Sequence, residues 1–207
     1  MRNFFDPDNW FWRGFGRMAD YFILSVCWLV CCVPLVTSGA ACIALYDAVA
    51  HCFCYHEGDM TRRFFGTFRK ELLRGVFLTM LWAAACLVLN MGYQIICQLA
   101  QGSTPWTVFS IVYYVTLFIP LGVMCWGVAI ESRFSNSLIS LHRTAFAFTF
   151  GHLLHTAAIV ALLVLALNIL LNFPFFLIFL PAITAHLQAL FVEKVFRKYM
   201  PEENTEA

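Results

Sequence analysis

The stretch that decides the fold is GVFLTMLWAAACLVLNMGYQIICQL at residues 75–99, followed by the polar segment AQGSTP at 100–105 and by WTVFSIVYYVTLFIPLGVMCWGVAI at 106–130. As a helix, each apolar run is long enough to cross a hydrocarbon core of about 30 Å. The polar segment between them leaves room only for a tight reversal. The sequence therefore predicts two antiparallel transmembrane helices that form a hairpin.

Further apolar runs lie on both sides of this hairpin. They occupy residues 19–36, 39–55, 153–171 and 175–192. Pro34 and Gly39 separate the first two, and such residues favour a turn between helices. We predict a single integral membrane domain over residues 1–207, an all-α, polytopic transmembrane helical bundle of about six spans.

The composition supports a lipid environment. Of the 207 residues, 61% are hydrophobic and 12% are charged, against about 25% charged in an ordinary soluble domain. The 22 phenylalanines add more apolar surface than one soluble core of this size could bury. A net charge of +1, without clustered cations and stacking aromatics, argues against a nucleic-acid partner. The N-terminus does not resemble a cleaved signal peptide, so we expect the first apolar run to be retained.

Two segments have the pattern of interfacial helices. Residues 1–18 mix tryptophan and phenylalanine with arginine, which is typical of a membrane surface. Residues 59–74 form a basic amphipathic pattern in which phenylalanine and leucine lie opposite cations. We expect these cations to contact anionic lipid or a protein partner; they are Arg62, Arg63, Arg69, Lys70 and Arg74.

The distribution of cations predicts the orientation. If residues 19–36 and 38–56 form a hairpin, all 13 Lys and Arg fall on one side of the membrane. The positive-inside rule makes that side cytoplasmic, with both termini and the charged tail at 194–207. A re-entrant first pair gives the same result, so the charges leave these two topologies open. A single kinked helix over both segments is a third possibility, which the charge bias disfavours.

Asp47 is the strongest single candidate for a functional residue. It lies midway along the second apolar run, where an ionisable group costs at least about 2.5–3.5 kcal/mol unless it is paired or faces water. The functional interpretation is a proton or cation relay, or an acceptor for a substrate. The structural interpretation is a bonded aspartate that holds helices together.

Other polar residues share helix faces. The third run carries a stripe spaced at four residues, and the start of the fifth run carries two histidines spaced at three. These side chains could line a polar cavity with Asp47, or could form interhelical hydrogen bonds; they are Asn90, Gln94, Gln98, His152 and His155.

Metal and catalytic sites are not predicted. In the segment HCFCYH at 51–56, only Cys52 and His56 share a helix face, whereas a structural zinc site needs four ligands. The sequence contains no nucleophile triad, no HExxH pattern and no phosphate-binding loop. We therefore expect neither a cofactor nor enzymatic activity.

A longer motif gives a family resemblance. The segment VPLVTSGA at 33–40, which includes Pro34, Thr37 and Gly39, is followed by Ala44, Leu45 and Tyr46. This pattern resembles the bacterial YesL-like family of small membrane proteins of unknown function, and shorter matches follow in the same order along the chain. Ser25 and Asp47 depart from the family pattern, which often has asparagine and an uncharged residue there.

The resemblance implies a role near carbohydrate uptake, because members of that family tend to be encoded beside sugar importers. We therefore expect a non-enzymatic membrane protein that assists or regulates carbohydrate uptake, with a sugar transporter subunit as a possible partner. The alternative is a small solute transporter or channel with a polar path near Asp47 and Gln94.

Overall fold

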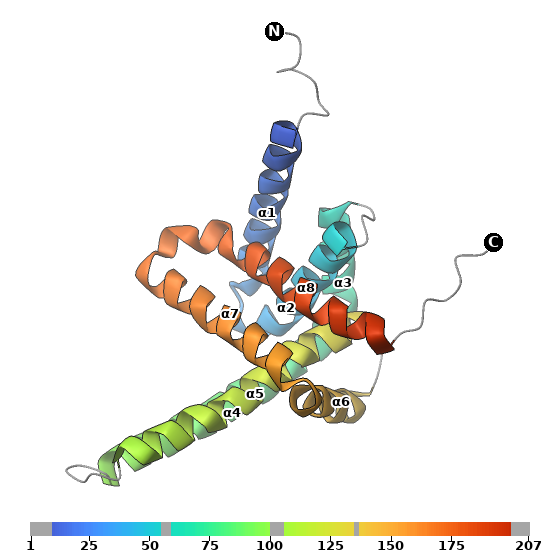
Figure 1. The fold of residues 1–207 in the computed structure, drawn as a ribbon. Helices are drawn as coiled ribbons and strands as arrows, with labels where there is room; N and C mark the ends of the chain where they lie inside the picture. The colour runs from blue at the N-terminus through green and yellow to red at the C-terminus, as the bar shows by residue number, and fades with distance from the viewer. Residues whose placement is uncertain (1–9, 55–58, 100–105, 135–136, 200–207) are drawn as a thin grey trace.

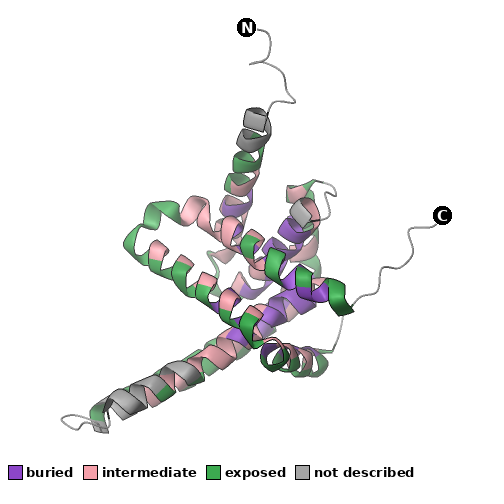
Figure 2. Ribbon diagram, in the orientation of Figure 1, coloured by how far each residue is buried: buried purple, intermediate pink, exposed green. Residues whose placement is uncertain are grey.

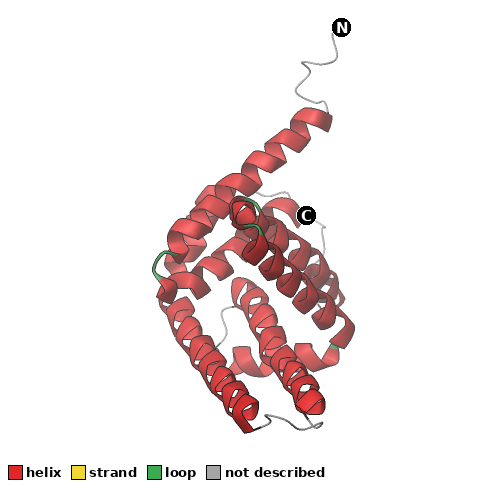
Figure 3. Ribbon diagram, turned by 90° about the vertical axis from the view of Figure 1, so that its left-hand side faces the viewer, coloured by secondary structure: helices red, strands yellow, loops and turns green. Residues whose placement is uncertain are grey.

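The computed structural model describes residues 10–54, 59–99, 106–134 and 137–199 (Figure 1). Within these ranges the chain is almost entirely helical and contains no strand (Figure 3). The predicted all-α class is therefore confirmed. The predicted polar loop at 100–105 and the ends of the chain, at 1–9 and 200–207, lie outside the described residues.

The helices follow one another with short connections. The α-helices are α1 (Trp10–Cys32), α2 (Ser38–Val49), α3 (Met60–Lys70), α4 (Leu72–Leu99), α5 (Trp106–Arg133), α6 (Leu138–Gly151), α7 (Leu153–Asn172) and α8 (Leu180–Tyr199). Two 3₁₀ turns, η1 (Leu35–Thr37) and η3 (Pro174–Ile178), precede α2 and α8, and the π-helical segment η2 (Ala50–Cys54) extends α2.

Helix α2 forms the centre of the molecule. It contacts α1, α3, α4, α5 and α8, and ten of its twelve residues are buried (Figure 2). Small side chains allow this enclosure. A Cβ added to Gly39 would lie 2.5 Å from the carbonyl oxygen of Gly75, and one added to Gly75 would overlap Ala40. The backbones of α2 and α4 are therefore in direct contact.

Helices α4 and α7 have the opposite character. They are long and apolar, yet few of their residues are buried within the molecule. Among the described residues, three helical segments are long and apolar enough to cross a membrane, namely Leu35–Cys52, Leu72–Ile95 and Leu153–Asn172. Three of the six predicted spans thus have this support. Those in α1, α5 and α8 remain predictions.

The ends of the helices differ from the predicted segments in three places. The described part of the interfacial segment 1–18 is continuous with the following apolar run in α1, because no proline interrupts it before Pro34. The amphipathic helix ends at Lys70, so Arg74 belongs to α4. Helix α8 continues to Tyr199, into the predicted tail.

The first apolar pair consists of two helices and not of one kinked helix. Helix α1 ends at Cys32, where Pro34 prevents its continuation. The chain then reverses through η1 and enters α2, which packs against α1. This corrects the single-helix possibility.

Candidate functional site

Asp47 is enclosed by polar side chains from α3. Its side chain is 2% exposed. Nε of Arg63 donates a hydrogen bond to Oδ2 of Asp47 at 2.8 Å, and Nη2 of Arg63 reaches Oδ1 at 3.3 Å. The hydroxyl of Thr67 also donates to Oδ2, at 2.5 Å. A cation and a hydroxyl one turn apart on α3 thus satisfy the buried carboxylate.

His51 completes this group. It lies one turn after Asp47, and its Nδ1 is 3.1 Å from Oδ1 of Asp47. Its Nε2 is 3.0 Å from Nη2 of Arg63. We call Asp47, His51, Arg63 and Thr67 the Asp47 cluster. Because both carboxylate oxygens already have partners, the arrangement matches the structural interpretation of Asp47, a bonded residue that joins two helices.

Among the described residues, three further carboxylates are buried, those of Glu71, Glu131 and Glu193. Oε1 of Glu71 lies 3.5 Å from Nζ of Lys70. Glu131 on α5 accepts a hydrogen bond from Nη1 of Arg74 on α4 at 3.1 Å. Glu193 on α8 accepts one from Nη2 of Arg133 on α5 at 2.6 Å. The side chains of Glu131 and Glu193 are at most 5% exposed.

The Glu193 pair lies close to the Asp47 cluster. Tyr46, the neighbour of Asp47 on α2, places its hydroxyl 3.5 Å from Oε1 of Glu193. Charged pairs therefore link α2 to α3, α4 to α5, and α5 to α8. We call this set the ion-pair belt; its members are Asp47, Arg63, Arg74, Glu131, Arg133 and Glu193.

Sequence reasoning missed the glutamates of the belt. Glu131 and Glu193 each follow directly after the last residue of a predicted span, and neither is among the predicted site residues. Their position in the sequence could have identified them. A carboxylate at the end of an apolar run needs a cation at the same depth in the bundle. Arg74 and Arg133, each within three residues of a predicted span boundary, were available for that role.

The basic helix α3 divides its cations between two surroundings. Phe64 is buried, and its ring stacks on that of Phe68 with centroids 6.2 Å apart. Arg63 turns inward to Asp47. Three cations lie on the outside, and we call them the cationic face: Arg62, Arg69 and Lys70. Of the five cations predicted to contact lipid or a partner, Arg63 and Arg74 form ion pairs with buried acids, while their own side chains stay 46% and 42% exposed.

The amide stripe lies apart from the Asp47 cluster. Asn90, Gln94 and Gln98 are all exposed on α4. Within the stripe, Nε2 of Gln94 donates a hydrogen bond to Oδ1 of Asn90 at 3.1 Å. Helix α4 contacts α2 at Gly75. Asn90 lies about 22 Å further along the axis of α4. The far end of α4 extends away from α2, toward the lower left of Figure 1. The structure therefore does not bring the stripe and Asp47 together.

The two histidines lie in an aromatic group at the junction of α6 and α7. The rings of His152 and His155 are 6.1 Å apart, and the ring of His152 stacks on Phe148. Nε2 of His152 is 3.3 Å from the hydroxyl of Tyr199. Burial, His155 and Lys198 lower the pKa of His152 below 6.5, so it is neutral at neutral pH. These contacts tie α8 to the start of α7.

The turn that carried the family resemblance has a structural role. Pro34 ends α1, and the hydroxyl of Thr37 donates to the carbonyl oxygens of Cys31 and Pro34, at 2.6 and 2.8 Å. The amide of Gly39 donates to the hydroxyl of Thr79 on α4 at 2.8 Å. The three residues reverse the chain and allow α2 to lie against α4.

These features define a class of protein: a helical bundle with membrane-suited apolar helices, organised around a central buried helix and a belt of ion pairs. Residues 21–93, about a third of the chain, match the model of a family described as "Protein of unknown function, DUF624". The YesL-like proteins are members of that family. The match covers the second half of α1, then α2 and α3, and α4 to Tyr93, and so includes the Asp47 cluster. No curated protein and no solved structure matches the chain.

Proposed function

We propose that the chain is a multi-pass, YesL-like membrane protein with both termini in the cytoplasm, where the cationic face of α3 binds a protein partner that assists carbohydrate uptake. The observation that carries this proposal is the division of cations on α3. Arg63 fixes the helix to Asp47, while Arg62, Arg69 and Lys70 stay exposed. Helix α3 is thereby held in one position with the cationic face exposed to an anionic surface, although Nζ of Lys70 also lies 3.5 Å from Oε1 of Glu71.

The arrangement of the helix ends supports the orientation. Helix α3, the start of α4 and the ends of α5 and α8 lie toward the right of Figure 1, whereas η1 and the turn between α7 and α8 lie toward the left. The belt arginines and most other described cations belong to the first group of ends. The positive-inside rule assigns such an end to the cytoplasm.

No observation favours the transport alternative. Asp47 has both carboxylate oxygens engaged by Arg63 and Thr67, and the amide stripe on α4 lies far from it. Among the described residues, the belt also pairs its acids with arginines and forms no group of three or more metal-ligating side chains. A relay would need Asp47 to exchange its present partners.

Co-purification from native membranes tests the proposal. The tagged wild-type chain is expected to carry a subunit of a carbohydrate importer with it. Combined reversal of Arg69→Glu and Lys70→Glu is expected to abolish that association while the protein stays in the membrane. Arg143→Glu, an exposed cation on α6, is the matched control and should retain the partner. A partner that binds the double variant unchanged would contradict the role of the cationic face.

A further inference from the structure

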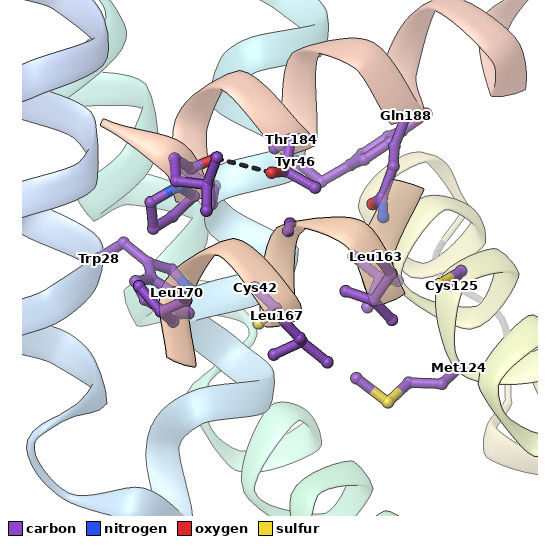
Figure 4. A pocket seen from close by; sticks show the side chains of 16 residues that line it. Trp28, Cys42, Tyr46, Met124, Cys125, Leu163, Leu167, Leu170, Thr184 and Gln188 are labelled. Atoms are coloured by element: carbon purple, nitrogen blue, oxygen red, sulfur yellow. Dashed lines mark hydrogen bonds between the residues drawn. The ribbon is translucent and has the colours of Figure 1, made fainter. Parts of the chain in front are cut away.

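A cavity of about 270 Å³ lies between α1, α2, α5, α7 and α8. Figure 4 shows Trp28, Cys42, Leu163, Leu167 and Met124 around it. Almost all of the lining is carbon and sulfur. The ion-pair belt and the contacts described above make no use of this space.

The chemistry of the walls selects an apolar occupant. Thr184, one of the few polar lining residues, donates its hydroxyl to the carbonyl oxygen of Leu180 at 2.7 Å. The hydroxyl of Tyr46, another lining residue, faces Glu193. Water or a sugar would therefore find few partners and would lose hydrogen bonds on entering. A hydrocarbon chain would lose none and would gain dispersion contacts with the walls.

The cavity has one polar end. The side chain of Gln188 reaches into the cavity from α8 (Figure 4). Gln188 is five residues before Glu193, which belongs to the ion-pair belt. This end of the cavity is therefore about 8 Å from the ion-pair belt, measured along the axis of α8. The opposite end is formed by Trp28 and Leu170. An occupant with an apolar tail and a polar head matches this polarity.

The wall on the side of α7 is incomplete. Leu167 lines the cavity and is still 48% exposed, and α7 presents other exposed leucines such as Leu165. If α7 spans the membrane, as the proposed function requires, the surroundings of this wall are the hydrocarbon tails of the bilayer. A tail could then enter sideways between helices without leaving an apolar medium.

We propose that the cavity between α1, α2, α5, α7 and α8 binds one acyl chain of a membrane phospholipid, with the headgroup at the end marked by Gln188. The inference rests on the membrane placement given under the proposed function, and not on the identity of the partner. The bound chain would fill the space that α7 leaves beside the central helix α2.

Photochemical cross-linking tests this site. The protein is placed in vesicles of phosphatidylethanolamine and phosphatidylglycerol that contain a phospholipid with a diazirine on its acyl chain, and mass spectrometry locates the adducts. Adducts are expected at Met124 and Cys125 inside the cavity, and also at outward residues such as Leu154 and Leu165. Ala166→Phe fills the cavity and should abolish the inner adducts while the outer ones persist.

The control is Ala157→Phe, an exposed position on the same helix, which should keep both sets of adducts. Leu163→Trp provides a second filling variant if Ala166→Phe does not fold. Adducts only at outward residues of the wild type, or inner adducts that survive filling, would overturn the acyl-chain site. Inner adducts formed by a diazirine fatty acid but not by the phospholipid would overturn the assignment to phospholipid. A complete absence of adducts would overturn the membrane placement as well.

Discussion

Asp47 shows how one charged residue can be kept inside an apolar helix. An isolated carboxylate there would be costly, but Arg63 and Thr67 from α3 supply a cation and a hydroxyl. Arg63 is 46% exposed, so its own charge is still partly solvated. The pair therefore acts mainly to position α3 on α2, and removal of the cation leaves the buried acid with only Thr67 and His51 as partners.

A double-mutant cycle measures this pairing. Asp47→Ala and Arg63→Ala are each expected to destabilise the protein, and together by less than the sum, with a coupling of about 1 kcal/mol or more. Unfolding in detergent supplies the free energies. The matched control pairs Asp47 with Arg62, the exposed neighbour of Arg63, and should show no coupling. Equal coupling in both cycles would contradict the assigned geometry.

His152 predicts a dependence of stability on pH. Its pKa is lowered in the folded state from 6.5, chiefly by burial, so the unfolded chain takes up a proton at a higher pH than the folded protein. Folding stability should therefore fall as the pH drops below about 6.5 and level off below the folded pKa. Thermal unfolding of the wild type and of His152→Phe between pH 8 and pH 5 checks this, and the variant should lose less stability. Parallel curves would argue against His152 as the cause.

The residue scale also shows what the sequence can and cannot predict. Asp47 was a clear candidate because one acid interrupted an apolar run. Its partner Arg63 could not be identified, because the distance between them depends on how α3 returns across α2. Glu193 and Arg133 lie 60 residues apart, and only the packing of α5 against α8 brings them together.

At the scale of elements, the contact of α2 with α4 depends on the absence of side chains. Gly39 and Gly75 let the two backbones meet, and Thr79 bridges them by accepting from the amide of Gly39 and donating to the carbonyl of Gly75. Close approach of this kind is common where small residues line helix contacts in membranes.

Gly39→Ala and Gly75→Ala are each expected to destabilise the protein by about 1–3 kcal/mol, because the new methyl group would overlap the backbone or Thr79 across the contact. Gly92→Ala on α4 is the control. Nothing lies within 4 Å of a Cβ at that position, so its higher helix propensity should leave stability unchanged or raise it by up to about 1 kcal/mol. Denaturant titration of the purified variants compares them. Similar losses at positions 75 and 92 would contradict the packing.

Helix positions were more predictable than helix environments. The runs at 75–99 and 106–130 became α4 and α5 with small changes at their ends, because long apolar segments leave few alternatives. The run at 39–55 was expected to be one span among six, yet α2 is the enclosed centre of the bundle. The mean hydropathy of Leu35–Cys52 is lower than that of the candidate spans in α4 and α7, and its alanines and glycine are small enough for close packing. Helix α6 was not predicted, and at 14 residues it is too short to cross a membrane.

On the scale of the whole molecule, two kinds of surface meet. Helices α4 and α7 present apolar side chains outward, which suits lipid, while the ion-pair belt and the cationic face gather charge near one set of helix ends. The two ends of α4 are about 40 Å apart, enough to separate Lys70 from Gln98 by a full bilayer core. We infer that the membrane lies between Lys70 and Gln98.

Labelling with a membrane-impermeant maleimide tests that claim most directly. Lys70→Cys and Gln98→Cys are made separately in a background without reactive native cysteines, and labelled in intact and in permeabilised cells. The account predicts that Gln98→Cys reacts in intact cells, whereas Lys70→Cys reacts only after permeabilisation. Equal reaction of both positions in intact cells, or protection of Gln98→Cys together with exposure of Lys70→Cys, would contradict it.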